Sequence, residues 1–457
     1  MIPKKKISNV FIIFLFFHLF IWTLIPSISN VNLPLDTIEA LAWGSNLDWG
    51  FDKHPPLSAV AVEFVYSIFG PRDWAYYLLS QIFVIIAFIY VWKLSEEIFE
   101  EKIYSLISIF ILEGIYFYNF TTPEFNVNVS QLPFWALTVY FFWKSINSNK
   151  IFNWILFGIF SALGFLSKYL FVYLLLAIFI YFLFNLKNNK KMITPYYFSI
   201  FISLAILIPH FIWLIENDFI TIFYGFGRTG LTDYNFINHI ANPAIFILKQ
   251  IVILIPVFLM IYVLLKRIKI KFNFRDKKIL FLIFINFIPL LLMLITAILT
   301  GAKIRTMWMT PFYLFFGILL VNLFQKNILL NKIKKFYILF LFFFILSPVL
   351  YLVISLSDST KRTDYPGKEI ARLVQNKWDQ NFRNEINIVV GDEWSAGNLS
   401  YHLYSRPIWV KNLENKTSQI KEYEGVIYVG NPKILKKVCP GVFGSIKPVG
   451  YCMIGIK

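Results

Sequence analysis

The run NVFIIFLFFHLFIWTLIPS occupies residues 9–27 and follows the lysines at Lys4 to Lys6. An apolar run of about 17 to 25 residues is long enough to cross the hydrocarbon core of a bilayer as a helix, which satisfies its own backbone polar groups. The run resembles a secretory signal peptide, but its apolar stretch is long and Ser27 to Ser29 is a poor cleavage site. We therefore predict an uncleaved membrane anchor.

The composition of the whole chain agrees with this anchor. Of its 457 residues, 58% are hydrophobic, 19% are aromatic and only 15% are charged, and the mean hydropathy is +0.64. A soluble chain carries about a quarter charged residues, so this apolar surface requires lipid as its solvent. The net charge of +17 comes from short basic clusters between apolar runs, which indicates membrane topology and not a nucleic-acid partner.

Further apolar runs predict a polytopic α-helical membrane protein with about eleven transmembrane helices. The fifth run is short enough to form tilted or partial spans together with the sixth. The predicted spans lie near residues 9–27, 73–92, 103–119, 131–146, 151–166, 169–186, 193–215, 243–265, 279–300, 306–324 and 336–356.

The distribution of basic residues predicts the orientation of these spans. With the N-terminus in the cytoplasm, the lysine-rich and arginine-rich connections all fall on the inner side, as the positive-inside rule requires. These connections are residues 93–102, 144–150, 187–191, 266–278 and 326–335. The opposite loops hold only Lys53, Arg72, Lys168, Arg228, Lys303 and Arg305.

An odd number of spans places residues 357–457 outside. This tail begins with a polar helical stretch at residues 367–378, followed by the apolar run 386–390, another helix-like stretch and β-rich runs at 408–410 and 426–429. We predict a small extracytoplasmic α/β domain for the tail, and a membrane domain for residues 1–356 with its first outer loop at 28–72.

The cysteine and histidine content gives little support for a protein-built metal site. Cys439 and Cys452 are too few for a disulfide framework and lack zinc-site spacing; in the outer compartment they are open to either a disulfide or two free thiols. No HxxxH or HxH pair occurs among the five histidines, which are His18, His54, His210, His239 and His402.

The first outer loop carries most of the chemistry-bearing side chains. Ionisable groups next to membrane aromatics are costly to keep without a function, although a solvated loop with interfacial tryptophans is the simpler interpretation. The loop contains Asp36, Glu39, Asp48, Asp52, Lys53, His54 and the Pro55-Pro56 pair.

Two other outer segments offer candidate binding groups. The second outer loop presents Glu124 with the amides of Asn126 and Asn128, although proline and asparagine are also ordinary turn residues. Lys168 stands between two apolar runs, where it either extends to the interface or holds a lipid phosphate.

The segment from Gly225 to Gly230 matches GxGxxG, but it follows a membrane span and does not belong to a strand-turn-helix unit. We expect a flexible loop there and no dinucleotide fold. Arg228 within it remains a candidate phosphate ligand.

In these motifs the chain resembles the prokaryotic members of the dolichyl-phosphate-mannose protein mannosyltransferase family, which include aminoarabinose transferases that act on lipid A. The resemblance runs nearly from end to end. It rests on Asp36, Trp43, Gly50 and Lys53 to Leu57, on Pro123 to Asn128 and Leu132 to Leu137, on Phe165 to Tyr169, Pro209 to Trp213 and Arg305 to Trp308, and in the tail on Tyr365 to Gly367 and Gly391 to Leu399.

The resemblance implies a GT-C fold with a catalytic first outer loop and a cavity open to the bilayer. By this likeness Asp36 matches the acid that begins the first-loop motif, the usual catalytic base, and Glu124 matches the second-loop acid. Many members carry two successive acids at the first position, whereas here Thr37 follows Asp36 and the next acid is Glu39. This departure affects the role of Glu39 more than that of Asp36.

The predicted activity is a membrane glycosyltransferase that moves a hexose or pentose from a polyprenyl-phosphate donor to a lipid, glycan or protein acceptor by inverting displacement. The expected location is the cytoplasmic membrane, with the active site outside and with membrane lipids, not nucleic acid, as partners. No cofactor is firmly implied; a divalent cation between Asp36 and the donor phosphate remains compatible. The residues assigned to the donor phosphate or substrate are Lys53, His54, Lys168, Arg228, Glu39, Asn126, Asn128 and Arg305.

Two other functional classes remain as alternatives. A transporter or lipid flippase predicts inverted repeats and charged or broken helices at the bilayer midplane, whereas the charges here gather at the outer interface. A structural subunit of an envelope complex leaves the acids of the first loop unexplained.

Overall fold

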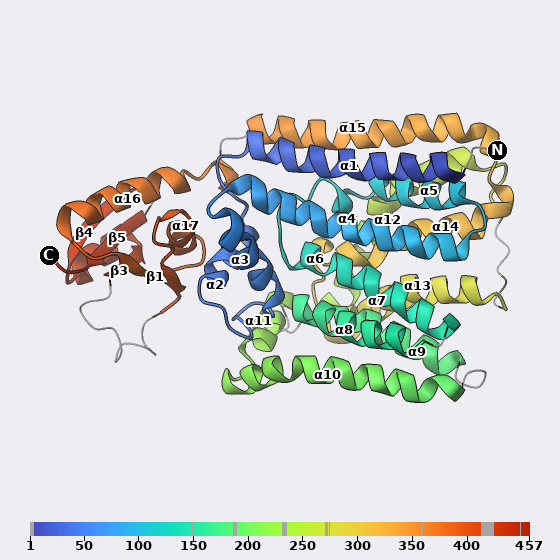
Figure 1. Ribbon diagram of the computed structural model, residues 1–457, viewed down its shortest axis with the longest axis horizontal. Coiled ribbons are helices and arrows are strands. Elements are labelled where there is room, and N and C mark those ends of the chain that lie inside the picture. Colours follow the sequence, from blue (N-terminus) through green and yellow to red (C-terminus); the bar gives the residue numbers. More distant parts are fainter. Residues whose placement is uncertain are drawn as a thin grey trace.

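The computed structural model describes residues 4–148, 150–185, 190–230, 235–269, 273, 275–357, 360–412, 425–447 and 449–457. Figure 1 shows a bundle of long helices with a small sheet beyond one of its ends. The helices up to residue 357 are α1 (Lys4–Ser29), α2 (Leu35–Gly44), α3 (Leu57–Phe69), α4 (Asp73–Ile98), α5 (Lys102–Phe110), α6 (Val127–Ser130), α7 (Leu132–Ser148), α8 (Ile151–Ser167), α9 (Val172–Asn185), α10 (Ile193–Glu216), α11 (Ile220–Thr229), α12 (Asn238–Leu264), α13 (Lys277–Thr300), α14 (Phe316–Phe324) and α15 (Ile333–Ser357).

Short 3₁₀ segments connect or extend several of these helices. They are η1 (Ile111–Gly114), η2 (Tyr116–Tyr118), η3 (Tyr169–Phe171), η5 (Lys190–Met192), η6 (Thr306–Tyr313), η7 (Gln325–Asn327), η8 (Leu330–Lys332) and η9 (Arg362–Asp364).

Most of the predicted spans are helical in the structure, but they differ in length. Among the described residues, six helices are long and apolar enough to cross a membrane, and the pair Thr306–Tyr313 and Phe316–Asn327, bent by 53°, makes a seventh. The predicted spans at 131–146, 151–166 and 169–186 correspond to the shorter helices α7, α8 and η3 with α9, and residue 186 lies outside the described part. The chain is therefore a multi-pass α-helical membrane protein.

The prediction of one continuous helix over residues 103–119 is wrong. The α-helix ends at Phe110, tightens into η1 and breaks before η2. A Cβ on Gly114 would lie 3.2 Å from the backbone nitrogen of Val257, so α12 approaches the chain closely at this break. Hydropathy does not detect such a break because the segment remains apolar on both sides.

Hydrogen bonds among the basic connections 93–102, 144–150, 266–278 and 326–335 and the start of α1 place these segments at one end of the bundle, as predicted. The described parts of connections 187–191 and 266–278 exclude residues 187–189, 270–272 and 274. The bonds are Lys102 Nζ to Ser8 Oγ (3.1 Å), Lys278 Nζ to the Ile98 carbonyl (2.7 Å), Lys277 Nζ to Asn147 Oδ1 (2.8 Å) and Lys266 N to the Asn327 carbonyl (3.0 Å). Figure 1 shows the N-terminus at this end and the sheet beyond the other.

The C-terminal part is a small α/β domain, as predicted. Its elements are α16 (Gly367–Asn381), β1 (Ile386–Val390), α17 (Ser395–His402), β2 (Ile408–Val410), β3 (Gly425–Gly430), α18 (Pro432–Val438), β4 (Val442–Ile446) and β5 (Val449–Ile454). The five-stranded sheet has the order β2-β1-β3-β5-β4, with β1 parallel to β2 and β3, and β5 antiparallel to β3 and β4. Strands β4 and β5 were not predicted.

A disulfide joins Cys439 and Cys452, which the sequence left open. It ties the end of α18 to β5. The domain boundary between residues 356 and 357 stays a proposal, and the end of α15 at Ser357 supports it.

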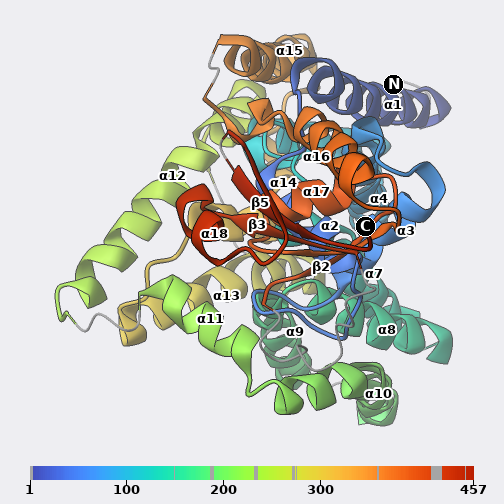
Figure 2. The ribbon, with the colours of Figure 1, turned by 90° about the vertical axis from the view of Figure 1, so that its left-hand side faces the viewer.

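The C-terminal domain and the first outer loop share one hydrophobic core. Trp43 and Phe51 from the loop are buried in the same cluster as Ile370, Leu399 and Trp409 from the domain. Figure 2 looks onto this end and shows the domain in front of α2, with α12 on the left and α10 at the bottom. The domain therefore fixes the loop that carries Asp36.

Candidate active site

A cavity of about 530 Å³ lies where several helices meet at the end of the bundle opposite the basic connections. Its walls come from the start of α2, the loop around residues 120–124, the end of α15, the segment 361–363, α11 and η6. The lining includes Asp36, Glu124, Arg228, Met307, Tyr351 and Arg362. The two acids that the sequence assigned to catalysis thus line one cavity together with two guanidinium groups.

The first turn of α2 brings Asp36 and Glu124 together. Pro34 precedes the helix and has no side chain that can cap it, so the first backbone N–H groups need another acceptor. The Asp36 N–H donates to Glu124 Oε1 at 3.1 Å, and Thr37 Oγ1 donates to the Phe125 carbonyl at 3.2 Å. The second outer loop therefore caps the helix of the first.

The protonation of these two acids is coupled by their proximity. Burial raises the pKa of Asp36, while the positive charges of Lys168, Lys53 and two arginines lower it. Burial also raises the pKa of Glu124, and the charge of Asp36 raises it further. Asp36 is consequently the acid of the pair that ionises more easily, and Glu124 is the one that keeps a proton.

Lys168 is buried behind the cavity and does not extend along the surface. The residue is only 6% exposed and follows the end of α8. The ammonium donates to Asn128 Oδ1 at 2.5 Å and lies 5.4 Å from the centre of the Trp308 ring. Burial lowers the pKa of Lys168 to about 7, and the negative charge of Asp36 opposes this decrease. Lys168 is outside the cavity lining among the described residues.

Lys53 is already paired with carboxylates. Its Nζ lies 2.8 Å from Glu39 Oε1 and 3.2 Å from Glu393 Oε1 of the C-terminal domain. Burial raises the pKa of Glu39, and the hydrogen bond from Lys53 opposes that rise. A phosphate would have to compete with both acids for Lys53.

His54 is neutral at physiological pH. Burial and the positive charges of Lys168, Lys53 and Arg228 lower its pKa to about 3. The imidazole meets the rings of Trp43 and Tyr224 edge-on at centroid distances of 6.0 and 6.3 Å. His54 is therefore suited to hydrogen bonding and not to carrying a charge.

The remaining predicted residues fall into different environments. Arg228 is exposed in the last turn of α11, lines the cavity and has no hydrogen-bond or ion-pair partner in the described part of the chain. Asn126 caps α6 by accepting from the N–H groups of Asn128 and Val129. Arg305 precedes η6 outside the cavity lining.

The segment from Gly225 to Gly230 is not the flexible loop that we expected. Residues up to Thr229 belong to α11, and Gly230 ends the helix in the left-handed conformation with φ of 74°. The helix turns Arg228 toward the cavity. The described elements before α11 are helices and 3₁₀ segments, so the Gly225 to Gly230 segment does not belong to a strand-turn-helix unit.

The family motif residue Gly50 has a steric explanation. A Cβ at this position would lie 2.3 Å from the Trp213 ring on α10. The nearby His210 Nδ1 lies 2.5 Å from the Trp49 carbonyl, and Thr221 Oγ1 donates to the Phe51 carbonyl at 2.7 Å. These contacts fix the first outer loop against α10 and α11.

Arg362 is the main cavity residue that the sequence prediction missed. It lies 5.9 Å from the Trp394 ring, and its charge lowers the pKa of Asp36 and Glu124 against the larger effect of burial. A signal was present, because Lys361 and Arg362 follow the last span on the side where basic residues are scarce.

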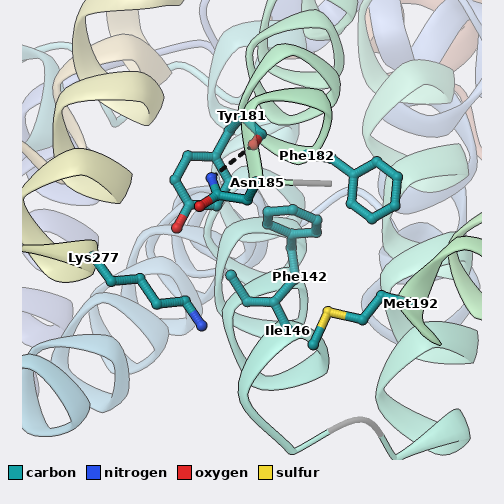
Figure 3. A pocket seen from close by; sticks show the side chains of 7 residues that line it. All are labelled: Phe142, Ile146, Tyr181, Phe182, Asn185, Met192 and Lys277. Atoms are coloured by element: carbon teal, nitrogen blue, oxygen red, sulfur yellow. Dashed lines mark hydrogen bonds between the residues drawn. The ribbon is translucent and has the colours of Figure 1, made fainter. Parts of the chain in front are cut away.

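A second pocket lies at the opposite, basic end of the bundle and has only about 10 Å³ of space. Figure 3 shows Lys277 beside apolar side chains such as Phe142 and Met192. It has room for little more than a water molecule. The described residues also contain no group of three or more potential His, Cys, Asp or Glu metal ligands.

Comparisons with known proteins agree with this fold. A family model described as dolichyl-phosphate-mannose-protein mannosyltransferase matches residues 53–213, which confirms the predicted resemblance over that segment. The match contains Glu124 and Lys168 but not Asp36 or Arg228. No curated protein matches the chain.

Solved structures extend the likeness to nearly the whole chain. Crystal structures of ArnT from Cupriavidus metallidurans, one bound to undecaprenyl phosphate and one in the apo state, are similar with a TM-score of 0.66. Each comparison covers 98% of both chains at 10% sequence identity. The fold is therefore the GT-C fold of membrane glycosyltransferases. Together with the family model, it indicates a glycosyltransferase.

Proposed function

We propose that this protein transfers a sugar from a polyprenyl-phosphate donor to an acceptor on the outer face of the cytoplasmic membrane. The observation that carries the proposal is the cavity in which Asp36 and Glu124 face Arg228 and Arg362. A lipid-linked sugar needs an anion-binding group for its phosphate and a base for the acceptor. Both groups line the same cavity, and undecaprenyl phosphate is the ligand in the similar ArnT structure.

The proposed reaction is a single inverting displacement. Asp36 accepts the proton of an acceptor hydroxyl or amine while that group attacks the anomeric carbon, and the bond from this carbon to the phosphate oxygen breaks. Polyprenyl phosphate leaves with the electron pair as a stable anion. The protein therefore has mainly to orient two substrates and to stabilise the phosphate.

The contacts refine the roles of the supporting residues. Arg228 is the best candidate for the donor phosphate because it is exposed to the cavity and has no partner within the described residues. Lys168 lies outside the cavity lining among the described residues, and its positive charge favours the ionised form of Asp36. Glu124 holds the Asp36 backbone through the 3.1 Å hydrogen bond.

Two observations support an outer location for the cavity. It lies at the end of the bundle away from the basic connections, which normally remain in the cytoplasm. The disulfide between Cys439 and Cys452 is at the same end and suits an oxidising compartment.

The transporter alternative gains one feature from the structure, the broken helix near Glu113. Glu113 is 3% exposed and paired with His18, and neither residue lines the outer cavity. A translocation path needs charged groups that face a passage. The buried pair does not supply one, so the transferase remains the better-supported function.

The test uses the purified full chain and a panel of undecaprenyl-phosphate-linked sugars, with a membrane lipid extract as acceptor. Release of undecaprenyl phosphate, measured by mass spectrometry, reports transfer without knowledge of the acceptor. We expect acceptor-dependent release with at least one sugar. Binding of undecaprenyl phosphate without release from any panel member, and with transbilayer movement of the lipid in vesicles, would favour a flippase.

A further inference from the structure

The break after α5 exposes backbone groups inside the membrane region, where they need protein partners. Asn119 provides one, because its Nδ2 donates to the backbone carbonyl of Glu113 at 2.9 Å. Its Oδ1 accepts from the Phe120 N–H at 2.6 Å and from Ser347 Oγ of α15 at 2.9 Å. Asn119 is 1% exposed and thus joins both sides of the break to a neighbouring helix.

The carboxyl of Glu113 extends this arrangement to α1. Glu113 Oε1 lies 2.9 Å from His18 Nδ1, and Glu113 Oε2 accepts from Asn119 Nδ2 at 3.3 Å. His18 is fully buried and contacts the rings of Phe14 and Phe88 edge-on. An ionisable pair at such a depth is expensive to maintain and usually has a specific function. Figure 1 shows α15 and α1 lying side by side at the top of the bundle, with α5 next to α1.

The same hydrogen bonds continue toward the cavity through Thr122. Thr122 Oγ1 donates to the Asn119 carbonyl at 2.6 Å and accepts from Gln81 Nε2 at 3.0 Å. Ser80 Oγ donates to the Thr122 carbonyl. Only Pro123 separates Thr122 from Glu124. The turn that carries Glu124 is therefore held in place by hydrogen bonds that involve side chains on α1, η1 and α4.

We infer that His18, Glu113, Asn119 and Thr122 form a positioning network that holds Glu124 against the first turn of α2. The inference rests on the proposed function, because it gives Glu124 its purpose there. None of the four residues lines the cavity, so they act through Glu124 and not on the substrate. The network determines where the Asp36 backbone sits, because Glu124 Oε1 accepts the Asp36 N–H.

Replacing the buried pair tests the network without leaving an unpaired charge. His18→Leu combined with Glu113→Leu substitutes apolar side chains for both partners, which buried ion pairs often tolerate. Asn286→Leu is the matched control, since Asn286 is 1% exposed on α13 and its Nδ2 donates only to the Leu282 carbonyl of its own helix. Thr122→Val is a second test variant that removes only a hydroxyl and keeps a similar shape.

We expect release of undecaprenyl phosphate to slow by roughly tenfold to a hundredfold in the paired variant, as for other small misplacements of catalytic groups. The KM for the donor should stay unchanged, because Arg228 on α11 is outside the network. The control should retain activity, and Thr122→Val should show the same change to a smaller degree. The single variant His18→Asn, in which Glu113 is kept, should retain much of the wild-type rate. The asparagine Nδ2 is as many bonds from Cα as His18 Nδ1, so it can still donate to Glu113.

A double-mutant cycle distinguishes positioning from a general loss of stability. If the network acts through Glu124, adding the paired replacement to Glu124→Ala, which removes the acceptor of the Asp36 N–H, should reduce turnover little further. Strictly additive losses, or full activity in both the paired variant and Thr122→Val, would overturn the inference. Should the paired variant not fold, Thr122→Val decides alone. An unaffected Asp36→Asn variant would instead refute the proposed catalytic role of Asp36 and leave the network as a structural element.

Discussion

Glu113 and Glu124 both lie in the irregular segment between α5 and α6, and both are surrounded by membrane helices. Their carboxyl groups have different hydrogen-bond partners. Glu113 has a partner for each carboxylate oxygen, His18 on one side and Asn119 on the other. Glu124 lines an open cavity and accepts a single backbone N–H, that of Asp36. The first acid is fully paired within the protein, whereas the second retains capacity to interact with a ligand.

This comparison separates acids that build the fold from acids available for chemistry. The same contrast applies to the cations. Lys53 is held by Glu39 and Glu393, whereas Arg228 faces the cavity without a partner in the described chain. A group that already has a strong partner gains less from a substrate, because binding must first break that pair. We therefore expect the largest functional effects at Asp36 and Arg228.

The largest effect is expected for Asp36→Asn. An amide of the same shape cannot accept a proton from the acceptor, so turnover should fall by at least about a hundredfold. Donor binding and expression should be preserved, because the variant keeps the backbone N–H that donates to Glu124. The measurement is undecaprenyl phosphate release at saturating donor together with donor affinity. Near-normal turnover in Asp36→Asn with a complete loss in Glu124→Gln would reverse the roles of the two acids.

The second effect concerns the affinity for the carrier. Arg228→Met should weaken binding of undecaprenyl phosphate by roughly tenfold, the loss expected for one charge-assisted hydrogen bond. Lys303→Met serves as control, since Lys303 is an exposed cation on the same outer side but outside the cavity lining. Equal affinities for the Arg228 and Lys303 variants, measured by thermophoresis in detergent, would remove Arg228 from the phosphate site.

The third effect is a smaller change in rate with a shift in pH dependence. The Lys168 charge lowers the pKa of Asp36, against the larger effect of burial, so Lys168→Met should raise that pKa. A general base works only when deprotonated, and activity is lost as the pH falls through its pKa. The acidic limb should therefore move to higher pH in Lys168→Met, with a loss of about threefold to tenfold near neutrality.

Glu124→Gln provides the opposing case, because it removes a neighbouring carboxylate and should move the acidic limb to lower pH. Identical limbs in the wild type and both variants would show that Asp36 does not sense these two groups.

The smallest effect is a gain in stability. Burial raises the pKa of Glu124 in the folded state. At pH values between the ordinary and the raised pKa, the folded protein therefore binds more protons than the unfolded chain. The free energy of unfolding consequently falls as the pH rises through this window. Glu124→Gln removes the cost of burying the charge. Above this window it should raise thermal stability by roughly 1 kcal/mol, or about 2 °C. A lower melting temperature than the wild type at alkaline pH would contradict the burial argument.

Hydropathy and charge distribution predicted most of the membrane architecture from the sequence. The lysine clusters predicted which ends of the helices meet, and hydrogen bonds such as Lys278 to Ile98 confirm it. The break between Phe110 and Tyr116 was missed because apolar residues on both sides hide it. Glu113 in the middle of a predicted span was an available signal of this break. A carboxyl group in a membrane span is costly unless it has a partner.

The candidate site was predictable only in part. Family motifs indicated Asp36 and Glu124, which the structure brings into hydrogen-bond contact. The pairing of Lys53 with Glu393 could not be inferred, because these residues are remote in sequence and meet only through the shared core of the loop and the C-terminal domain. Local patterns carry no information about such tertiary contacts.

A cryo-EM structure of the full chain with undecaprenyl phosphate would show whether the cavity at the outer end holds the carrier phosphate beside Asp36. We expect phosphate density in contact with Arg228, inside the cavity lined by Asp36 and Glu124, with Glu113 still bound to His18. Phosphate density at the basic end of the bundle, or in the cavity but remote from both Arg228 and Asp36, would contradict the proposed site.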